Sequence, residues 1–311
     1  MLKRARAFSP AGISSFFEIC DRTSDGQIMS NPELIGARGG GFSPDKGVLT
    51  EVTISDAKET EVHVFINKIL CPEAETTMSV VNMLIKKINQ PYEITVMHNV
   101  DVPIGAGFGS SAAGSLGTAL ALSKVLGLNL TYNQLGRIAH VAEVKSKTGL
   151  GTVGPLLFGG CGLSIAPGAP GIARLDRIPV PSDYRLIMGT FNPYQTKKFL
   201  SSDKKRELIN KWGRITLKKI LENPSLENFM KSCKDFAIGT GFVTERVKKL
   251  IDLSERAGAV GATQNMIGEA VHALVKVDHM MSVYDVFRTV LPEEKIIIAN
   301  IDFQGARLIE C

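Results

Sequence analysis

The chain has 311 residues, of which 44% are apolar and 22% are charged, and its formal net charge is +5. This composition is typical of a globular protein with one large or two medium cores, and domain sizes favour two. No apolar run reaches the roughly 18 residues that cross a bilayer, and the segment Met1–Arg6 is a basic start of a strand rather than an apolar signal core. We therefore expect a cytoplasmic protein with no membrane partner.

The five cysteines lie far apart and never in a CxxC spacing, so neither a disulfide framework nor a zinc site is predicted. A basic run between Lys197 and Lys219 raises nucleic-acid binding as one interpretation. A solvated helix face explains the run better, because acidic residues are nearly as numerous as basic ones in the chain. We expect no nucleic-acid partner, and the mild positive excess suits an anionic substrate.

Alternating apolar and polar residues predict four strands in the first half of the chain. These strands cover Lys3–Phe8, Glu51–Ser55, Glu61–Asn67 and Tyr92–His98. The stretch Ser110–Leu126 is rich in Ala, Gly and Leu, which is typical of a helix packed on all sides. Thr131 and Gln134 have the spacing of a capping box, which predicts a second helix from there to about Lys147.

A Pro- and Gly-rich passage from Ala166 to Pro181 interrupts both periodicities and predicts a domain junction. We therefore expect two domains, residues 1–180 and 181–311. The second is predicted to begin with the strand Tyr184–Thr190 and to continue with helices near 203–222, 226–236, 243–256 and 283–291 and strands near 271–277, 295–301 and 306–310. Strands and helices mix without strict alternation, which favours an α+β class in both halves.

The segment Pro103–Ala113, PIGAGFGSSAA, joins a predicted strand to a predicted helix. Its alternate glycines, Gly105, Gly107 and Gly109, let backbone N–H groups turn toward one point without interference from a Cβ. The helix N-terminus behind them adds free N–H groups and a positive dipole end, so the segment favours an anion. It lacks the lysine of a GxxxxGK[ST] loop and the spacing of GxGxxG. In a simpler interpretation, Ser110 or Ser111 is an ordinary N-cap, which needs fewer glycines than the segment contains.

PIGAGFGSSAA resembles the P-x-x-x-G-L-G-S-S-A-A motif of the GHMP kinases, with Phe108 where Leu is usual. The resemblance implies a two-domain GHMP kinase fold, with an S5 domain 2-like N-terminal domain, a ferredoxin-like C-terminal domain, and ATP and substrate in the cleft between them. It implies that Ser111 helps to hold Mg²⁺. The implied ATP-binding residues are Pro103, Gly105, Ala106, Gly107, Phe108, Gly109, Ser110, Ser111 and Ala112.

Glu143 lies near the end of a predicted helix, before a glycine-rich turn, where the family places a carboxylate that coordinates Mg²⁺. Spacing alone leaves open an i,i+4 pair with Lys147 on a solvated face. Many GHMP kinases have an aspartate, thought to be the general base, at the position of Thr152, and a threonine cannot accept a proton at neutral pH. Asp21 or Asp101 could substitute, although phosphoryl transfer depends mainly on positioning and charge neutralisation. The implied catalytic residues are Ser111, Glu143 and Thr152.

Three further segments resemble the archaeal pantoate kinases within this family. Gly258–Gly268 is similar to their Met-containing third motif, Phe8–Phe17 to their opening FSPGHITGFF, and Gly36–Gly41 to a glycine-rich loop. The resemblance implies that the chain phosphorylates pantoate to 4-phosphopantoate in coenzyme A biosynthesis. A GHMP kinase for another small hydroxy acid, such as mevalonate, shikimate or homoserine, and a catalytically silent GHMP-fold regulatory protein are the alternatives.

Pantoate carries a carboxylate, so its pocket should contain a fixed cation. Arg38 in the glycine-rich loop is the first candidate, because guanidinium binds carboxylate through two parallel hydrogen bonds. Arg22 is the second, and Thr196 with Lys197 could close over the site. For each of them an ordinary surface position is the alternative. The sequence leaves the oligomeric state open, with a homodimer as one arrangement.

Overall fold

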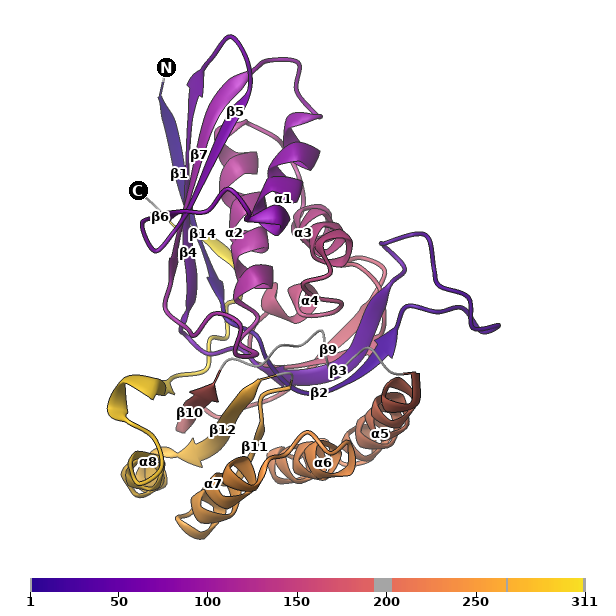
Figure 1. The fold of residues 1–311 in the computed structure, drawn as a ribbon, viewed down its shortest axis with the longest axis vertical. Coiled ribbons are helices and arrows are strands. Elements are labelled where there is room, and N and C mark those ends of the chain that lie inside the picture. Colours follow the sequence, from indigo (N-terminus) through magenta and orange to yellow (C-terminus); the bar gives the residue numbers. More distant parts are fainter. Residues whose placement is uncertain (1, 193–202, 267, 310–311) are drawn as a thin grey trace.

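The computed structural model describes residues 2–192, 203–266 and 268–309, and within these ranges the chain forms three β-sheets with helices packed against them (Figure 1). The predicted α+β class is confirmed. No helix in these ranges is both long enough and apolar enough to cross a membrane.

The first sheet has six strands in the order β14-β1-β4-β7-β5-β6. They are β1 (Lys3–Pro10), β4 (Gly47–Asp56), β5 (Glu61–Ile66), β6 (Ile69–Leu70), β7 (Tyr92–Val100) and β14 (Arg307–Ile309). The helices α1 (Glu75–Ile85), α2 (Ser110–Val125) and α3 (Tyr132–Ser146) cover one face (Figure 1). Residues alternate between the faces, so Ala5 and Ala7 of β1 are buried while Arg4 and Arg6 donate to Glu51 on β4.

Helix α3 begins as the sequence predicts. The hydroxyl of Thr131 accepts from the backbone N–H of Gln134, and the side chain of Gln134 accepts from the backbone N–H of Thr131, which forms the capping box. The helix ends at Ser146, and Lys147 follows in the left-handed region with a φ of +56°. These two ends place Glu143 in the last turn of the helix.

The second sheet has the order β2-β3-β8-β9. Its strands are β2 (Ile13–Cys20), β3 (Gly36–Phe42), β8 (Cys161–Ala166) and β9 (Arg174–Ile178), and the short helix α4 (Val153–Leu156) precedes β8. The prediction of a loop at Gly36–Gly41 is wrong, because this segment is most of β3. A Cβ at Gly41 would lie 1.7 Å from the carbonyl oxygen of Ile13, so the glycine is required by the close approach of β3 to β2.

Strand β9 lies inside the Ala166–Pro181 passage that the sequence predicts as a junction. It pairs antiparallel with β8 after a turn in which Gly168 and Gly171 have positive φ. The passage therefore contains the turn and the second strand of a hairpin in the second sheet. The prediction that it interrupts the strand pattern is wrong.

The third sheet has the order β11-β12-β10-β13. Its strands are β10 (Tyr184–Asn192), β11 (Gly261–Gln264), β12 (Glu269–Lys276) and β13 (Ile296–Ala299). The helices of this half are α5 (Asp203–Glu222), α6 (Leu226–Gly239), α7 (Glu245–Arg256) and α8 (Met280–Arg288), with short 3₁₀ turns at Val277–His279 and Glu293–Lys295.

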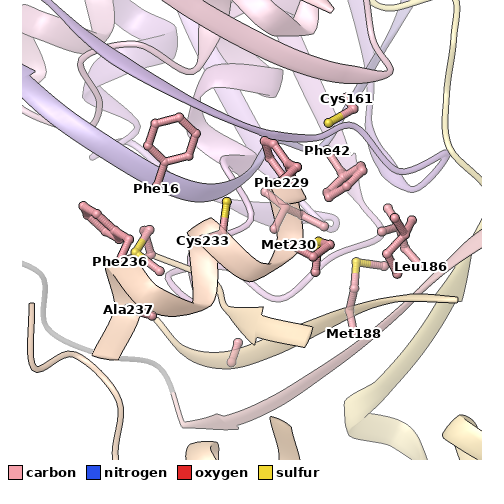
Figure 2. Packing of buried hydrophobic residues seen from close by; sticks show 14 of the residues in the cluster. Phe16, Phe42, Cys161, Leu186, Met188, Phe229, Met230, Cys233, Phe236 and Ala237 are labelled. Carbon is pink, nitrogen blue, oxygen red and sulfur yellow. The ribbon is translucent and has the colours of Figure 1, made fainter. Parts of the chain in front are cut away.

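One apolar core joins the second sheet to the third. Phe16 of β2 and Phe42 of β3 meet Phe229 of α6, and the rings of Phe42 and Phe229 contact edge to face with centroids 5.3 Å apart. Figure 2 shows the same cluster continuing to Leu186 and Met188 on β10. A division at residues 180 and 181 stays a prediction, but this core crosses it, and β14 pairs with β1 of the first sheet.

Helix α5 protects the edge of the second sheet. The side chain of Asn210 accepts from the backbone N–H of Ile19 at 2.8 Å and donates to the carbonyl of Ile19 at 3.1 Å, as a neighbouring strand would. A Cβ at Gly213 would lie 2.5 Å from the carbonyl oxygen of Phe17, so the helix backbone approaches β2 closely. The edge of β2 is thereby covered rather than open to another chain.

Candidate active site

The loop before α2 has the alternating structure that its sequence predicts. Gly105, Gly107 and Gly109 have φ values of +77°, +82° and +61°, in the left-handed region that favours glycine. Between them, Ala106 and Phe108 are each 1% exposed and belong to the apolar core shared by the second and third sheets. The apolar side chains therefore anchor the loop while the glycines turn its backbone, and Phe108 supplies an anchor where Leu is usual in the motif.

Helix α2 begins directly behind this loop. Its N-cap is Gly109 in the left-handed conformation, without a side-chain capping bond, so the interpretation of Ser110 or Ser111 as an ordinary N-cap is wrong. The first intrahelical bond runs from the N–H of Ala113 to the carbonyl of Gly109 at 3.0 Å. The N–H groups of Ser110, Ser111 and Ala112 have no acceptor within the helix, and they stand at its positive dipole end, an arrangement that favours an anion.

Two segments of the first half hold the end of the loop. The N–H of Gly12, between β1 and β2, donates to the carbonyl of Phe108 at 2.9 Å. A Cβ at Gly109 would lie 2.9 Å from both the carbonyl oxygen of Gly12 and the methyl carbon of Thr152. Thr152 stands just before α4, and its side chain makes no capping bond to that helix. Its methyl group therefore packs on the loop.

The third predicted motif reaches the loop from the other half of the chain. A Cβ at Gly107 would lie 2.9 Å from the carbonyl oxygen of Met266, and a Cβ at Gly268 would lie 2.2 Å from that of Ala106. These distances leave room for no side chain at either glycine. The end of the Gly258–Gly268 motif therefore lies against the loop.

Four oxygen-bearing side chains meet at the start of α2. The hydroxyl of Ser111 donates to the carboxylate of Glu143 at 2.5 Å, and the hydroxyl of Thr148 donates to the same oxygen at 2.7 Å. Thr76, in the first turn of α1, lies 3.1 Å from the hydroxyl of Thr148 and 3.4 Å from that of Ser111. The predicted proximity of Ser111 and Glu143 is therefore seen. Thr76 and Thr148 were not predicted as residues of the site.

Glu143 is 3% exposed, so the alternative of a solvated pair with Lys147 is wrong. Burial raises the pKa of Glu143 above its usual range, and the hydrogen bonds from Ser111 and Thr148 partly oppose that rise. A Cβ at Gly149 would lie 2.3 Å from the second carboxylate oxygen, which explains the glycine after Thr148. A buried carboxylate of this kind is stabilised by a nearby cation.

The oxygen atoms of Ser111 and Glu143 suit a magnesium ion. Mg²⁺ is usually bound through one or two carboxylates together with substrate phosphates and water, rather than by an all-protein cage. Within the residues that the structure describes, no group of three or more His, Cys, Asp or Glu side chains could hold a metal. One buried carboxylate and one hydroxyl beside a phosphate-binding loop fit that pattern.

The predicted substrate cations Arg38 and Arg22 are paired with carboxylates. The guanidinium of Arg38 donates to the buried carboxylate of Glu18 at 2.8 Å, and Arg214 of α5 donates to the same carboxylate at 3.0 Å. Arg22 forms an exposed ion pair with Asp203 at 3.1 Å. Thr196 lies outside the described residues.

The two carboxylates that could replace the missing general base also have partners. Asp21 forms an ion pair with Arg206 of α5. Asp101 accepts from the side chain of Asn99 at 3.4 Å. Neither contact involves a residue of the Ser111 and Glu143 cluster.

Comparison with known proteins agrees with this geometry. The model of the GHMP kinases N terminal domain matches residues 75–160, which include the loop and Glu143. A pantoate kinase of Methanocaldococcus jannaschii is 30% identical over 86% of this chain and 92% of its own length. A pantoate kinase of Thermococcus kodakarensis is 33% identical over 87% of each.

The chain belongs to the GHMP kinase family.

The fold agrees across this family. A solved structure of a phosphotransferase related to the coenzyme A biosynthesis pathway is 30% identical, with a TM-score of 0.87 over 99% of both chains. A homoserine kinase of Cytophaga hutchinsonii shares the fold at 16% identity, with a TM-score of 0.72 over 98% of this chain and 97% of its own. The predicted GHMP kinase fold is confirmed, and the chain is a small-molecule kinase of a family that uses ATP.

Proposed function

We propose that the chain transfers the γ-phosphoryl group of ATP to a hydroxyl of pantoate, which gives ADP and 4-phosphopantoate, a step toward coenzyme A. The observation that carries this proposal is the match of curated pantoate kinases to more than four fifths of the chain, at 30% and 33% identity. It is supported by an intact phosphate loop with the Ser111 and Glu143 pair behind it. The related phosphotransferase of known structure is named for the same pathway.

In this proposal the phosphates of ATP lie on the loop between Pro103 and Ala112. The N–H groups at the start of α2 donate to phosphate oxygens, and the dipole of the helix stabilises the charge that moves to the leaving oxygen. Ser111 and Glu143 hold Mg²⁺, which neutralises phosphate charge when bound. Binding brings a carboxylate that burial disfavours next to a positive charge, so Glu143 is better stabilised with the nucleotide than without it.

Thr152 has a packing role in this reaction rather than a chemical one. Its methyl group lies against Gly12 and Gly109, where it fixes the end of the phosphate loop. A loose transition state for phosphoryl transfer needs little removal of the hydroxyl proton before the P–O bond forms. Alignment of the pantoate hydroxyl with the γ-phosphate is then the main contribution of the protein.

The residue that binds the pantoate carboxylate is a separate part of the proposal. Arg38 and Arg22 stay the candidates from sequence, but a substrate carboxylate would compete there with Glu18 or Asp203. Arg38 also faces away from the turn before α4, because Ala37, its neighbour in β3, is the residue that contacts Gly151. Both contacts count against Arg38 and Arg22 as the residues that bind the carboxylate, while Thr196 and Lys197 of the sequence prediction lie outside the described residues. A cytoplasmic location completes the proposal, and the oligomeric state stays open, with a homodimer as one arrangement.

The test is ADP release in a coupled assay with Mg·ATP, offering pantoate, mevalonate, homoserine and shikimate separately. We expect turnover with pantoate, and a loss of kcat of about 100-fold in Ser111→Ala and in Glu143→Gln, because each removes a charge-assisted contact in a buried site. Glu227→Gln, an exposed carboxylate in the first turn of α6, is the matched control for loss of charge and should keep full activity. Turnover confined to another hydroxy acid would replace the substrate assignment, and ATP binding without turnover would contradict the kinase proposal in favour of a regulatory protein.

A further inference from the structure

A chain of three buried polar side chains links β2 to β12 beside the phosphate loop. The hydroxyl of Ser15 lies 2.9 Å from Nε2 of His272, and Nδ1 of His272 lies 2.7 Å from Oδ1 of Asn265. All three residues have zero exposed surface. Ser15 and His272 are 257 residues apart in the sequence, so the chain joins the two halves of the molecule.

The chemistry of the three groups fixes the direction of each hydrogen bond. The side-chain oxygen of Asn265 can only accept, so Nδ1 of His272 carries the hydrogen and donates it. Nε2 then has a lone pair that accepts from the hydroxyl of Ser15. Burial lowers the pKa of His272 to about 3, which keeps the imidazole neutral, and the acceptor oxygen of Asn265 determines which nitrogen carries the hydrogen. The amide of Asn265 is therefore held in one orientation.

Asn265 belongs to the turn that lies on the loop. A Cβ at Gly107 would lie 3.4 Å from the Cβ of Asn265 and 2.9 Å from the carbonyl oxygen of Met266. The N–H of Met266 donates to the carbonyl of Ser14 at 2.9 Å, and the N–H of Gly268 donates to the carbonyl of Asn265 at 3.1 Å. The turn is thus fixed to β2 on one side and contacts Gly107 on the other.

The amide nitrogen of Asn265 is a buried donor without an acceptor among the described residues. Such a donor lowers stability, and an unsatisfied buried group in a native structure needs a cause, such as a bound water, a bound ion or a role in function. His272 occupies the oxygen of the amide, so the two N–H donors of the nitrogen are directed away from the imidazole. The Cβ of the residue that bears these donors lies 3.4 Å from the position of a Cβ at Gly107 of the loop.

We propose that Asn265 is a positioning residue for the phosphate loop, and that Ser15 and His272 orient its amide so that the nitrogen donates to the occupied loop. The inference rests on the proposed binding of ATP at this loop. It assigns roles to Ser15 and Asn265, which lie in segments that resemble family motifs, and to His272, which lies in none of them. It also gives the third motif a function beyond the close approach of its glycines.

The experiment compares two substitutions of His272, each of which keeps a polar group at one of its two contacts and removes the other. Asn in place of His272 keeps a donor near the position of Nδ1, and Gln keeps a group near the position of Nε2. We would measure the affinity for the Mg²⁺ complex of the non-hydrolysable analogue AMPPCP by calorimetry, together with the melting temperature. His98→Gln is the control, because His98 is also buried and neutral, with Thr50 and Thr77 as its partners.

We expect His272→Gln and Asn265→Ala to weaken binding of the analogue by about tenfold, which corresponds to about 1.4 kcal/mol, and His272→Asn to stay within about twofold of the unmodified protein. His98→Gln should lower the melting temperature as much as His272→Gln without this loss of affinity. Equal weakening in both His272 variants, or none in His272→Gln, would overturn the inference while the proposed function stands. Failure of the unmodified protein to bind AMPPCP would overturn both.

If His272→Gln does not fold, Ser15→Ala replaces it in the comparison. This substitution removes the far end of the chain and leaves the contact between His272 and Asn265 intact, so the expected loss of affinity is about threefold. An unchanged affinity in Ser15→Ala would overturn the inference in that case.

Discussion

Replacing Gly107 by alanine is expected to destabilise the protein more than replacing Gly105 by alanine, although both glycines have nearly the same backbone conformation. Their φ values are +82° and +77°, so an alanine at either position loses about 1 to 2 kcal/mol from the left-handed conformation. The surroundings differ. A Cβ at Gly105 would have no atom within 4 Å, whereas one at Gly107 would lie 2.9 Å from the carbonyl oxygen of Met266.

This backbone oxygen cannot rotate away as a side chain can, so Gly107→Ala carries an overpacking term of about 1 to 3 kcal/mol that Gly105→Ala lacks. The expected total is about 2 to 5 kcal/mol for Gly107→Ala and about 1 to 2 kcal/mol for Gly105→Ala. Urea unfolding followed by circular dichroism measures both free energies, with affinity for Mg·AMPPCP as a second readout. Equal destabilisation by the two variants would show that the third motif does not press on the loop, and would refute the reasoning.

Three other predictions follow from single contacts. Burial raises the pKa of Glu143, so the carboxyl group of Glu143 binds a proton more tightly in the folded protein than in the unfolded chain. The stability of the protein without ligand should therefore fall as the pH rises from the ordinary pKa of 4.5 through the raised pKa, and melting curves of Glu143→Gln should lack this fall. Thr152→Val keeps the methyl group against the loop, so kcat should stay within about threefold, and a loss of about 100-fold would show that the hydroxyl takes part in the reaction. Asn210→Ala removes two hydrogen bonds to Ile19, and chemical denaturation should show a loss of about 2 kcal/mol; a change below the error of the method would mean that α5 is held by its apolar face alone.

The phosphate loop and the helix behind it were predictable because their signals are local. Alternate glycines permit the positive φ values that the loop adopts, and the capping box of Thr131 and Gln134 lies within four residues. Glu143 could be placed on its helix from the sequence, but its burial could not, since spacing alone allowed a solvated pair with Lys147. Burial depends on α1 and α2, which pack beside α3 and are separate in the sequence.

The wrong predictions concern residues whose type is explained by a partner that lies far away in the sequence. The glycines of β3 indicate a loop when read along the chain, yet they are required by the carbonyl groups of β2. Arg38 resembles a free cation in the sequence, but β2 places Glu18 opposite it in the sheet. Thr148 reaches Glu143 across the turn after α3, and Thr76 of α1 contacts Thr148. The two threonines are 72 residues apart, and the sequence gives no signal of their contact.

The pairing of β14 with β1 bears on how the molecule assembles during synthesis. Residues 307–309 complete the edge of a sheet whose other strands lie within the first hundred residues. Until a ribosome has added them, the backbone of Arg6, Ala7 and Phe8 lacks this neighbour, although α2 can already pack on the sheet. The first half can therefore form its helical layer early, but its outer strand stays open to wrong pairing until almost the entire sequence shown has been translated.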